Sequence, residues 1–204
     1  MAAAGYNARP EVIQLLLRAG ADVNAWDSMS MTALSWAAMR SSNPQVIRVT
    51  LEAGADAESR DVGGDTPLMF GARHNPSPAV LAALLAAHAN LEARDHTEET
   101  ALLLAARYNN VAVVTQLLDF GADAKAQDNL DLTAFDWAKN NAKLRGSRVM
   151  SRLKDSPRLR RFAGLQKWIR TTAAVVACDH DWRYLDLKRG SQWRRPSARL
   201  LSCF

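Results

Sequence analysis

A pattern of apolar and polar positions recurs along the chain every 33 to 34 residues. It is clearest between Asp95 and Ala126, where two apolar segments flank a polar break at Asn109-Asn110 and end at Gly121-Ala122-Asp123. Each segment has the spacing of apolar residues that is typical of an amphipathic helix. A fixed period of this length predicts a stacked array of similar units, each made of two short helices and a loop.

Threonines mark the register of the repeat. They are Thr32, Thr66, Thr100 and Thr133, spaced by 34, 34 and 33 residues. Each precedes an apolar segment and is expected to cap a helix, because a hydroxyl oxygen can accept a hydrogen bond from an orphan amide there. The register divides the chain into a partial unit 1–25, units 26–59, 60–93 and 94–126, and a C-terminal unit 127–156. Residues 157–204 do not follow the repeat.

The second helix of a unit is expected to end at a glycine, as at Gly54 and Gly121. Glycine adopts the left-handed conformation that ends a helix without strain. The unit 60–93 has His88 in this place. Histidine can adopt this conformation less readily than glycine. We therefore interpret His88 as a tolerated cap residue and not as a ligand.

The partial unit 1–25 begins in the middle of its first helix, because Ala3-Ala4 aligns with Ala37-Ala38. Its second helix, residues 11–18, is clear. End units of repeat arrays normally carry a polar outer face. The sequence thus favours the hypothesis that further residues precede Met1 in the native protein, and a leader could be among them.

These motifs resemble the ankyrin repeat. Asp61, Gly64 and Thr66-Pro67-Leu68 match the turn and first helix of that family, and the segment 20–25, Gly-Ala-Asp-Val-Asn-Ala, matches its closing loop. The resemblance covers about residues 1–156 and implies an all-α ankyrin-repeat solenoid of stacked helix-turn-helix units with hairpin-like loops. One feature departs from the family pattern, since the histidine that follows the leucine is replaced by Ser35, Met69, Leu103 and Asp136. Without the buried hydrogen bonds attributed to that histidine, we expect lower stability per unit.

The charge is divided unevenly. Residues 1–142 hold 10 Lys and Arg against 17 Asp and Glu, whereas residues 143–204 hold 16 against 4. The body therefore carries −7 and the rest of the chain +12, which together give the net +5. This split predicts an acidic folded body with a basic tail at 157–204. The chain contains no run of 18 apolar residues, so the sequence predicts no helix that spans a membrane.

No pattern in the chain points to catalysis. Glycine-rich phosphate loops, His-Glu metal helices and nucleophile elbows are absent from the sequence. Cys178 and Cys203 are too far apart to define a metal site, and Cys178-Asp179-His180 is too short to hold a metal. We expect no enzyme activity, no cofactor and no metal.

The resemblance instead implies a non-catalytic module for protein-protein interaction, which binds its partner at the hairpin tips and the concave face of the first helices. The hairpin candidates are Ser28, Met29, Met31, Val62, Asp65, His96, Thr97, Glu99, Asn129, Leu130 and Leu132. The helix-end candidates are Met39, Arg40, Arg73, His74, Arg107 and Tyr108. Apolar candidates such as Met29, Met31 and Leu132 are expected to be exposed, as at interfaces. We expect a cytoplasmic protein.

The basic tail supports an alternative hypothesis. Arginines such as Arg158 and Arg170 surround Phe162 and Trp168, a mixture that could contact nucleic acid or an anionic membrane. The last part, residues 188–204, is rich in Arg, Ser and Trp without a period. Such a composition is as typical of a read-through or shifted reading frame as of a selected sequence.

Overall fold

The computed structural model describes residues 4–5 and 9–155, in which helices alternate with loops. The chain divides into two units, residues 1–166 and 167–204, and only the first contains described residues. The basic tail predicted at 157–204 therefore lies outside them. The regular elements of the described part are α-helices, and its only bridges are two isolated ones, between Trp26 and Thr32 and between Gln127 and Thr133.

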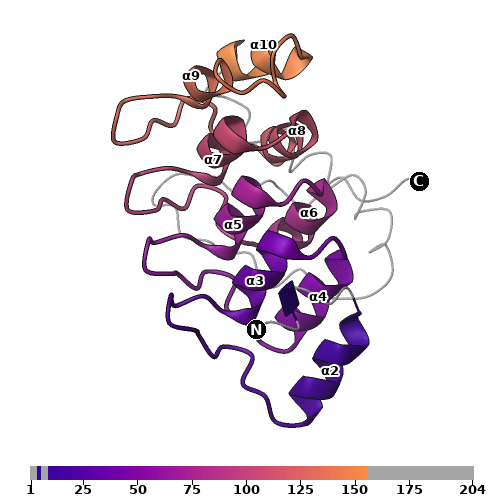
Figure 1. Ribbon diagram of the computed structural model, residues 1–204. Coiled ribbons are helices and arrows are strands. Elements are labelled where there is room, and N and C mark those ends of the chain that lie inside the picture. Colours follow the sequence, from indigo (N-terminus) through magenta and orange to yellow (C-terminus); the bar gives the residue numbers. More distant parts are fainter. Residues whose placement is uncertain (1–3, 6–8, 156–204) are drawn as a thin grey trace, which may run out of the picture. The chain divides into compact units, whose positions relative to one another are not determined.

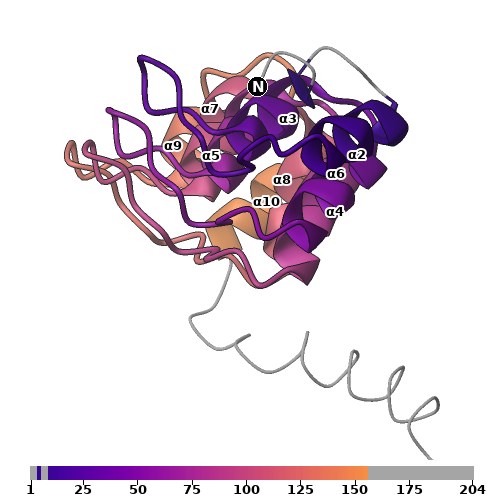
Figure 2. The same ribbon diagram turned by 90° about the horizontal axis from the view of Figure 1, so that it is seen from below.

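The helices form two layers. The first helices of successive units are α3 (Ala33–Arg40), α5 (Pro67–His74), α7 (Ala101–Tyr108) and α9 (Ala134–Ala138). The second helices are α2 (Pro10–Arg18), α4 (Pro44–Glu52), α6 (Pro78–Ala86), α8 (Val111–Asp119) and α10 (Arg148–Asp155). Each helix packs on its counterpart in the next unit, and the hairpin loops project from the same side of the stack, at the left of Figure 1. Figure 2, seen from below, separates the two layers. The expected all-α repeat solenoid is confirmed.

Threonine hydroxyls cap the first helices, as the register predicts. Each accepts a hydrogen bond from the backbone N–H three residues later, at Thr32, Thr66, Thr100 and Thr133. Three of the four residues that replace the family histidine still contact the capping threonine. The Ser35 hydroxyl lies 3.2 Å from that of Thr32, Met69 accepts the N–H of Thr66, and Asp136 accepts that of Thr133. The side chain of Leu103 has no polar group, so Leu103 is hydrogen-bonded to Thr100 only through the backbone bond of the cap.

Small and aliphatic side chains fill the space between units. The paired alanines Ala37-Ala38 and Ala105-Ala106 are completely buried, so that successive first helices lie close together. Val46 and its counterparts Val80 and Val113 are also completely buried in the second layer. A pair of helices this short cannot cover its own apolar face, and stacking in the array supplies the missing cover.

A buried asparagine follows each of the first helices α5, α7 and α9 and ties it to the preceding unit. The amide group of Asn75 donates to the carbonyl oxygens of Ala38 and Ser41 at 2.9 and 2.7 Å. Asn109 and Asn141 repeat this arrangement: Asn109 donates to Ala72 and Asn75, and Asn141 donates to Ala106 and Asn109. The last carbonyls of a helix lack partners within it. The asparagine ladder, Asn75, Asn109 and Asn141, supplies donors to carbonyls at the ends of α3, α5 and α7.

Left-handed residues occur at two recurring places. His88 has a φ of 63°, beside 87° for Gly54 and 96° for Gly121, which confirms the conformation expected of it. The residue two positions before each capping threonine is also left-handed. These residues are Ser30, Gly64, Glu98 and Asp131. The repeat thus imposes this conformation whatever residue the sequence supplies.

Replacing His88 by glycine should stabilise the array by about 1 kcal/mol, because glycine adopts a positive φ without steric cost. Thermal or urea unfolding followed by circular dichroism measures the effect. Ala87→Gly is the matched control, since Ala87 has a φ of −89° and gains nothing from glycine. A midpoint for His88→Gly that is unchanged or lower would contradict this interpretation.

Asn109→Ala should destabilise the array by about 2–4 kcal/mol, because it leaves two buried carbonyls without their donor. Asn140→Ala provides the control, since Asn140 is exposed beside the ladder residue of the next unit. Urea unfolding of both variants checks this. An equal loss of unfolding free energy in the two variants would contradict the stabilising role of the ladder.

Candidate binding surface

The hairpin tips form a row held by their own backbone. An aspartate begins each hairpin, and its carboxylate accepts the backbone N–H groups two and four residues later, as Asp27 does from Met29 and Met31. Neighbouring tips are also joined directly. Backbone bonds of 3.1–3.2 Å run from Val62 to Met29, from His96 to Gly63 and from Asn129 to Thr97. The tips therefore keep a fixed spacing.

Most of the hairpin candidates are accessible at these tips. The exposed ones are Ser28, Met29, Val62, His96, Thr97, Asn129 and Leu130. Three of them present apolar side chains, with exposed fractions of 48% for Met29, 66% for Val62 and 64% for Leu130. Such side chains can contact another protein without further rearrangement.

The expectation of exposure is wrong for Met31, Asp65 and Glu99, which are 3%, 6% and 6% exposed, and Leu132 is only partly exposed. These four residues share one register position, immediately before the capping threonine. At this position the chain turns from the hairpin into the first helix, and the side chain lies beneath the loop. Met31, Asp65 and Glu99 therefore support the surface from within.

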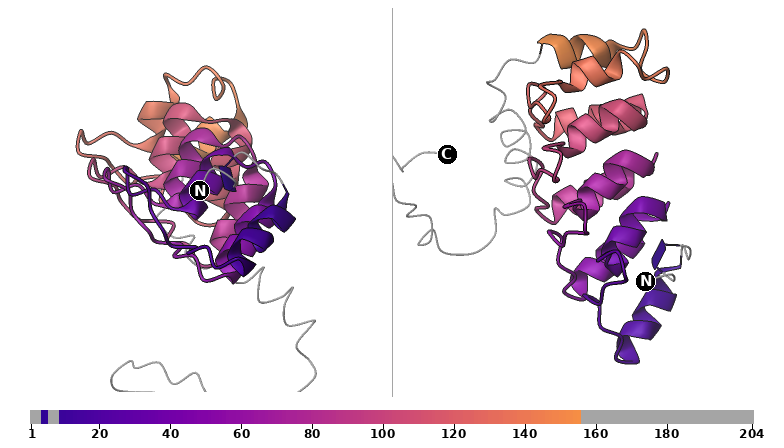
Figure 3. Two further views of the ribbon diagram at one scale, coloured as in Figure 1. Left: turned by 60° about the horizontal axis from the view of Figure 1, so that its bottom comes forward. Right: turned by 60° about the vertical axis from the view of Figure 1, so that its left-hand side comes forward.

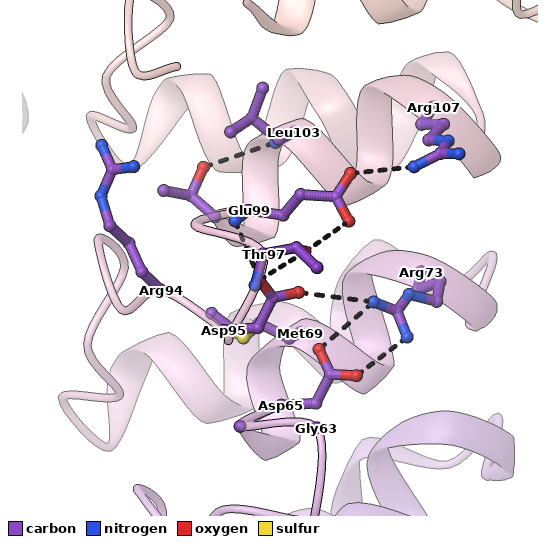
Figure 4. Close-up of polar contacts among 12 residues, drawn as sticks. Gly63, Asp65, Met69, Arg73, Arg94, Asp95, Thr97, Glu99, Leu103 and Arg107 are labelled. Carbon is purple, nitrogen blue, oxygen red and sulfur yellow. Dashed lines mark hydrogen bonds and ion pairs between the residues drawn. The ribbon is translucent and has the colours of Figure 1, made fainter. Parts of the chain in front are cut away.

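Asp65 and Glu99 hold two of the helix-end candidates. Arg73 donates to Asp65 at 2.8 Å, and its other terminal nitrogen lies 3.7 Å from the carboxylate of Asp95 in the next hairpin. Arg107 pairs with Glu99 at 3.2 Å. Figure 4 shows Arg73 between the two aspartates and Arg107 above Glu99. Arg73 therefore links two successive units.

This cluster shifts the protonation of its members. Burial raises the pKa of Asp65, while the guanidinium of Arg73 acts in the opposite direction. At His74, burial lowers the pKa, and the nearby charges of Arg73 and Arg40 lower it further. Both effects favour the neutral form of the His74 imidazole.

Tryptophans replace the arginine pairs in the outer units. The indole N–H of Trp36 donates to Asp27 at 2.8 Å, and that of Trp137 donates to Asp128 at 2.7 Å. The hydrogen bond from Trp36 lowers the pKa of Asp27. Cations cover both rings, because the guanidinium of Arg107 lies 3.9 Å from the centre of the Trp137 ring and that of Arg40 lies 5.9 Å from the Trp36 ring.

A hollow of about 580 Å³ opens at the C-terminal ends of α5 and α7, lined by Arg73, His74 and Tyr108. Arg40 is exposed at the equivalent end of α3, and Met39 is partly buried beside it. Figure 3 shows from two further sides how the first helices stack. Within the described part of the chain, no group of His, Cys, Asp and Glu could hold a metal ion, and no helix is long and apolar enough to cross a membrane.

Sequence reasoning identified the helix-end positions but missed the pairs that hold them. The available signal was an acidic residue eight positions before an arginine in two successive units, at Asp65 and Arg73 and at Glu99 and Arg107. Unit 26–59 has Met31 and Met39 at these positions, so the signal appears only in the middle of the array.

Arg73→Gln should cost about 3 kcal/mol at pH 7, because it leaves the buried carboxylates of Asp65 and Asp95 without their cation. The loss should shrink as the pH falls toward 4. A buried carboxyl with a raised folded-state pKa binds its proton more tightly than the unfolded chain does, so protonation favours the folded state.

Urea unfolding at pH 7 and pH 4 measures this loss. Arg48→Gln is the control, since Arg48 is exposed on α4. A loss for Arg73→Gln that grows toward pH 4 would contradict the electrostatic account.

Comparison with known families supports the fold. A model for ankyrin repeats in three copies matches residues 1–95, and a model for a single ankyrin repeat matches residues 97–129. A search of curated proteins found no match. Ankyrin repeats are generally protein-protein interaction modules and are typically non-catalytic. These matches agree with the 33- to 34-residue period and the paired helices, and they show that the chain belongs to the ankyrin repeat family.

Proposed function

We propose that the array is a non-catalytic module that binds a protein partner through its hairpin tips and the exposed ends of its first helices. The observation that carries the proposal is the row of apolar tip residues Met29, Val62 and Leu130, which are exposed on a rigid framework. Exposed apolar groups on a fixed scaffold favour association, because little conformational freedom is lost on binding.

The contrast between framework and surface supports the same function. Positions that hold the fold repeat from unit to unit, as the threonine caps do. Positions at the tips and helix ends differ in chemistry: Arg40, His74 and Tyr108 share one register position. A fixed scaffold that carries varied exposed residues is typical of a binding surface.

The proposed contact residues are the accessible candidates. They are Ser28, Met29, Met39, Arg40, Val62, Arg73, His74, His96, Thr97, Arg107, Tyr108, Asn129 and Leu130. Ankyrin repeat proteins are often cytoplasmic, and we place the module in that compartment as part of the proposal.

The alternative is contact with nucleic acid or an anionic membrane through residues 157–204. Residues 157–204 hold 11 Lys and Arg against 3 Asp, a net charge of +8 that favours it. Contacts with phosphates and anionic lipids weaken steeply with salt, whereas burial of apolar tips does not. Salt therefore separates the two functions.

Capture from the native lysate by the full chain, at low and high salt, tests the proposal. We expect a protein that is retained at high salt and lost from the tip variant Val62→Ser/Leu130→Ser. Leu15→Ser/Phe120→Ser is the control, because it removes two exposed apolar side chains away from the tips, 68% and 44% exposed. Capture that salt abolishes and that the tip variant leaves intact would favour the tail instead.

A further inference from the structure

We propose that the exposed row Arg40, His74 and Tyr108, together with the hollow that Arg73, His74 and Tyr108 line, receives carboxylate side chains from an acidic segment of the protein partner. This inference rests on the proposed function and names the chemistry of the ligand.

Cations gather at the ends of the first helices of the inner units. The last turns of α3, α5 and α7 contain Arg40, Arg73 with His74, and Arg107 respectively. The last turns of α4, α6 and α8 contain no basic residue. The helix dipole favours cations at C-termini in general, and α2 and α10 of the second layer also end in basic residues, Arg18 and Arg152 with Lys154. Between α3 and α8, however, the first helices end in cations and the second helices do not.

The acidic groups near the row are withdrawn from solvent. Asp65, Asp95 and Glu99 are buried beneath Arg73 and Arg107. The exposed residues of the row are Arg40, His74 and Tyr108, of which Tyr108 is 44% exposed. A ligand approaching this face therefore meets positive charge and an aromatic ring before it meets any of these carboxylates.

Exposed carboxylates gather instead around the ends of the second helices. Glu52 and Asp119 end α4 and α8, and Asp56 and Asp123 lie in the loops that follow. At α4 and α8 the second layer thus ends in negative charge, whereas α3, α5 and α7 of the first layer end in positive charge. The polarity of the row is a local feature of an otherwise acidic body, because residues 1–142 carry −7.

The hollow suits a carboxylate on a short aliphatic stem. The guanidinium of Arg107 lies 4.9 Å from the centre of the Tyr108 ring, which lines the hollow. The stem of a glutamate can pack on the ring while its carboxylate accepts charge-assisted hydrogen bonds from guanidinium groups. The Nζ of Lys143 donates to the carbonyl of Tyr108 at 3.4 Å and adds another positive charge nearby.

The surrounding charge favours a protein segment over a nucleic acid. A long polyanion would also meet the net negative charge of the folded array, which is −3 over residues 1–155. A segment with a few acidic residues avoids this repulsion, because its charge is confined to the row.

A fluorescein-labelled dodecapeptide of alternating Gly and Glu, with its Gln counterpart, tests the proposal by fluorescence anisotropy on the full chain at 0.15 M salt. We expect the Glu peptide to bind, the Gln peptide to bind at least tenfold more weakly, and Arg40→Gln/Tyr108→Ala to weaken the Glu peptide about tenfold. Arg40→Lys, which keeps the charge, should lose less than Arg40→Gln.

Arg48→Gln/Phe120→Ala is the matched control, because it removes one exposed arginine and one exposed aromatic ring elsewhere in the array. Binding through the basic tail would be the same in all variants, so a Glu peptide whose affinity the row variant leaves unchanged overturns the proposal. A twelve-residue oligothymidylate is the second probe. If the row variant weakens its binding as much as that of the Glu peptide, the row is a general polyanion site and the proposal also fails.

The capture experiment stays independent of this one. Capture that depends on the tips, together with peptide binding that does not depend on the row, would refute the acidic ligand and leave the proposed function standing. If capture does not depend on the tips and peptide binding does not depend on the row, the proposed function itself is refuted.

Discussion

The structure depends on the bonds that cross each unit boundary, and the asparagine ladder is the most regular of them. Asn75, Asn109 and Asn141 each donate twice to carbonyls of the preceding unit. Two helices of eight or nine residues have little stability alone, since helix formation is cooperative and nucleation is costly. Apolar stacking supplies the driving force, while the ladder fixes the register in which units stack, because a buried carbonyl without a donor is costly.

A framework specified in this way leaves the outer positions free to vary. The hairpins are positioned by their own aspartates and by bonds to the neighbouring tips, and the helix ends are positioned by the ladder. In the middle of the array, arginines bridge hairpins and helices, and in the outer units tryptophans do so. Both arrangements anchor the loop while they place a cation or an aromatic ring at the surface. The surface chemistry thus arises from the groups that hold the loops in place.

The period and the threonine register were sufficient to predict the helices, their caps and the left-handed His88, because these features depend on local sequence. The burial of Met31, Asp65 and Glu99 could not be predicted in the same way. Alternate residues of a hairpin face in or out, and repeat register alone does not say which. The ladder was also missed: Asn109 was interpreted as part of a polar break, and only the stacking of units shows which carbonyls its amide reaches. Features that depend on contacts between units could not be predicted from the sequence and are seen only in the structure.

Hydrogen-deuterium exchange of the full chain, alone and with the captured protein, tests the central claim most directly. The account predicts that binding protects amides in the hairpins, above all around Met29, Val62 and Leu130, and at the ends of α3, α5 and α7. Amides in α4, α6 and α8 should exchange as in the free chain. Protection confined to residues 157–204 or to the second helices would contradict the account, because the partner would then bind without the surface that the repeats form.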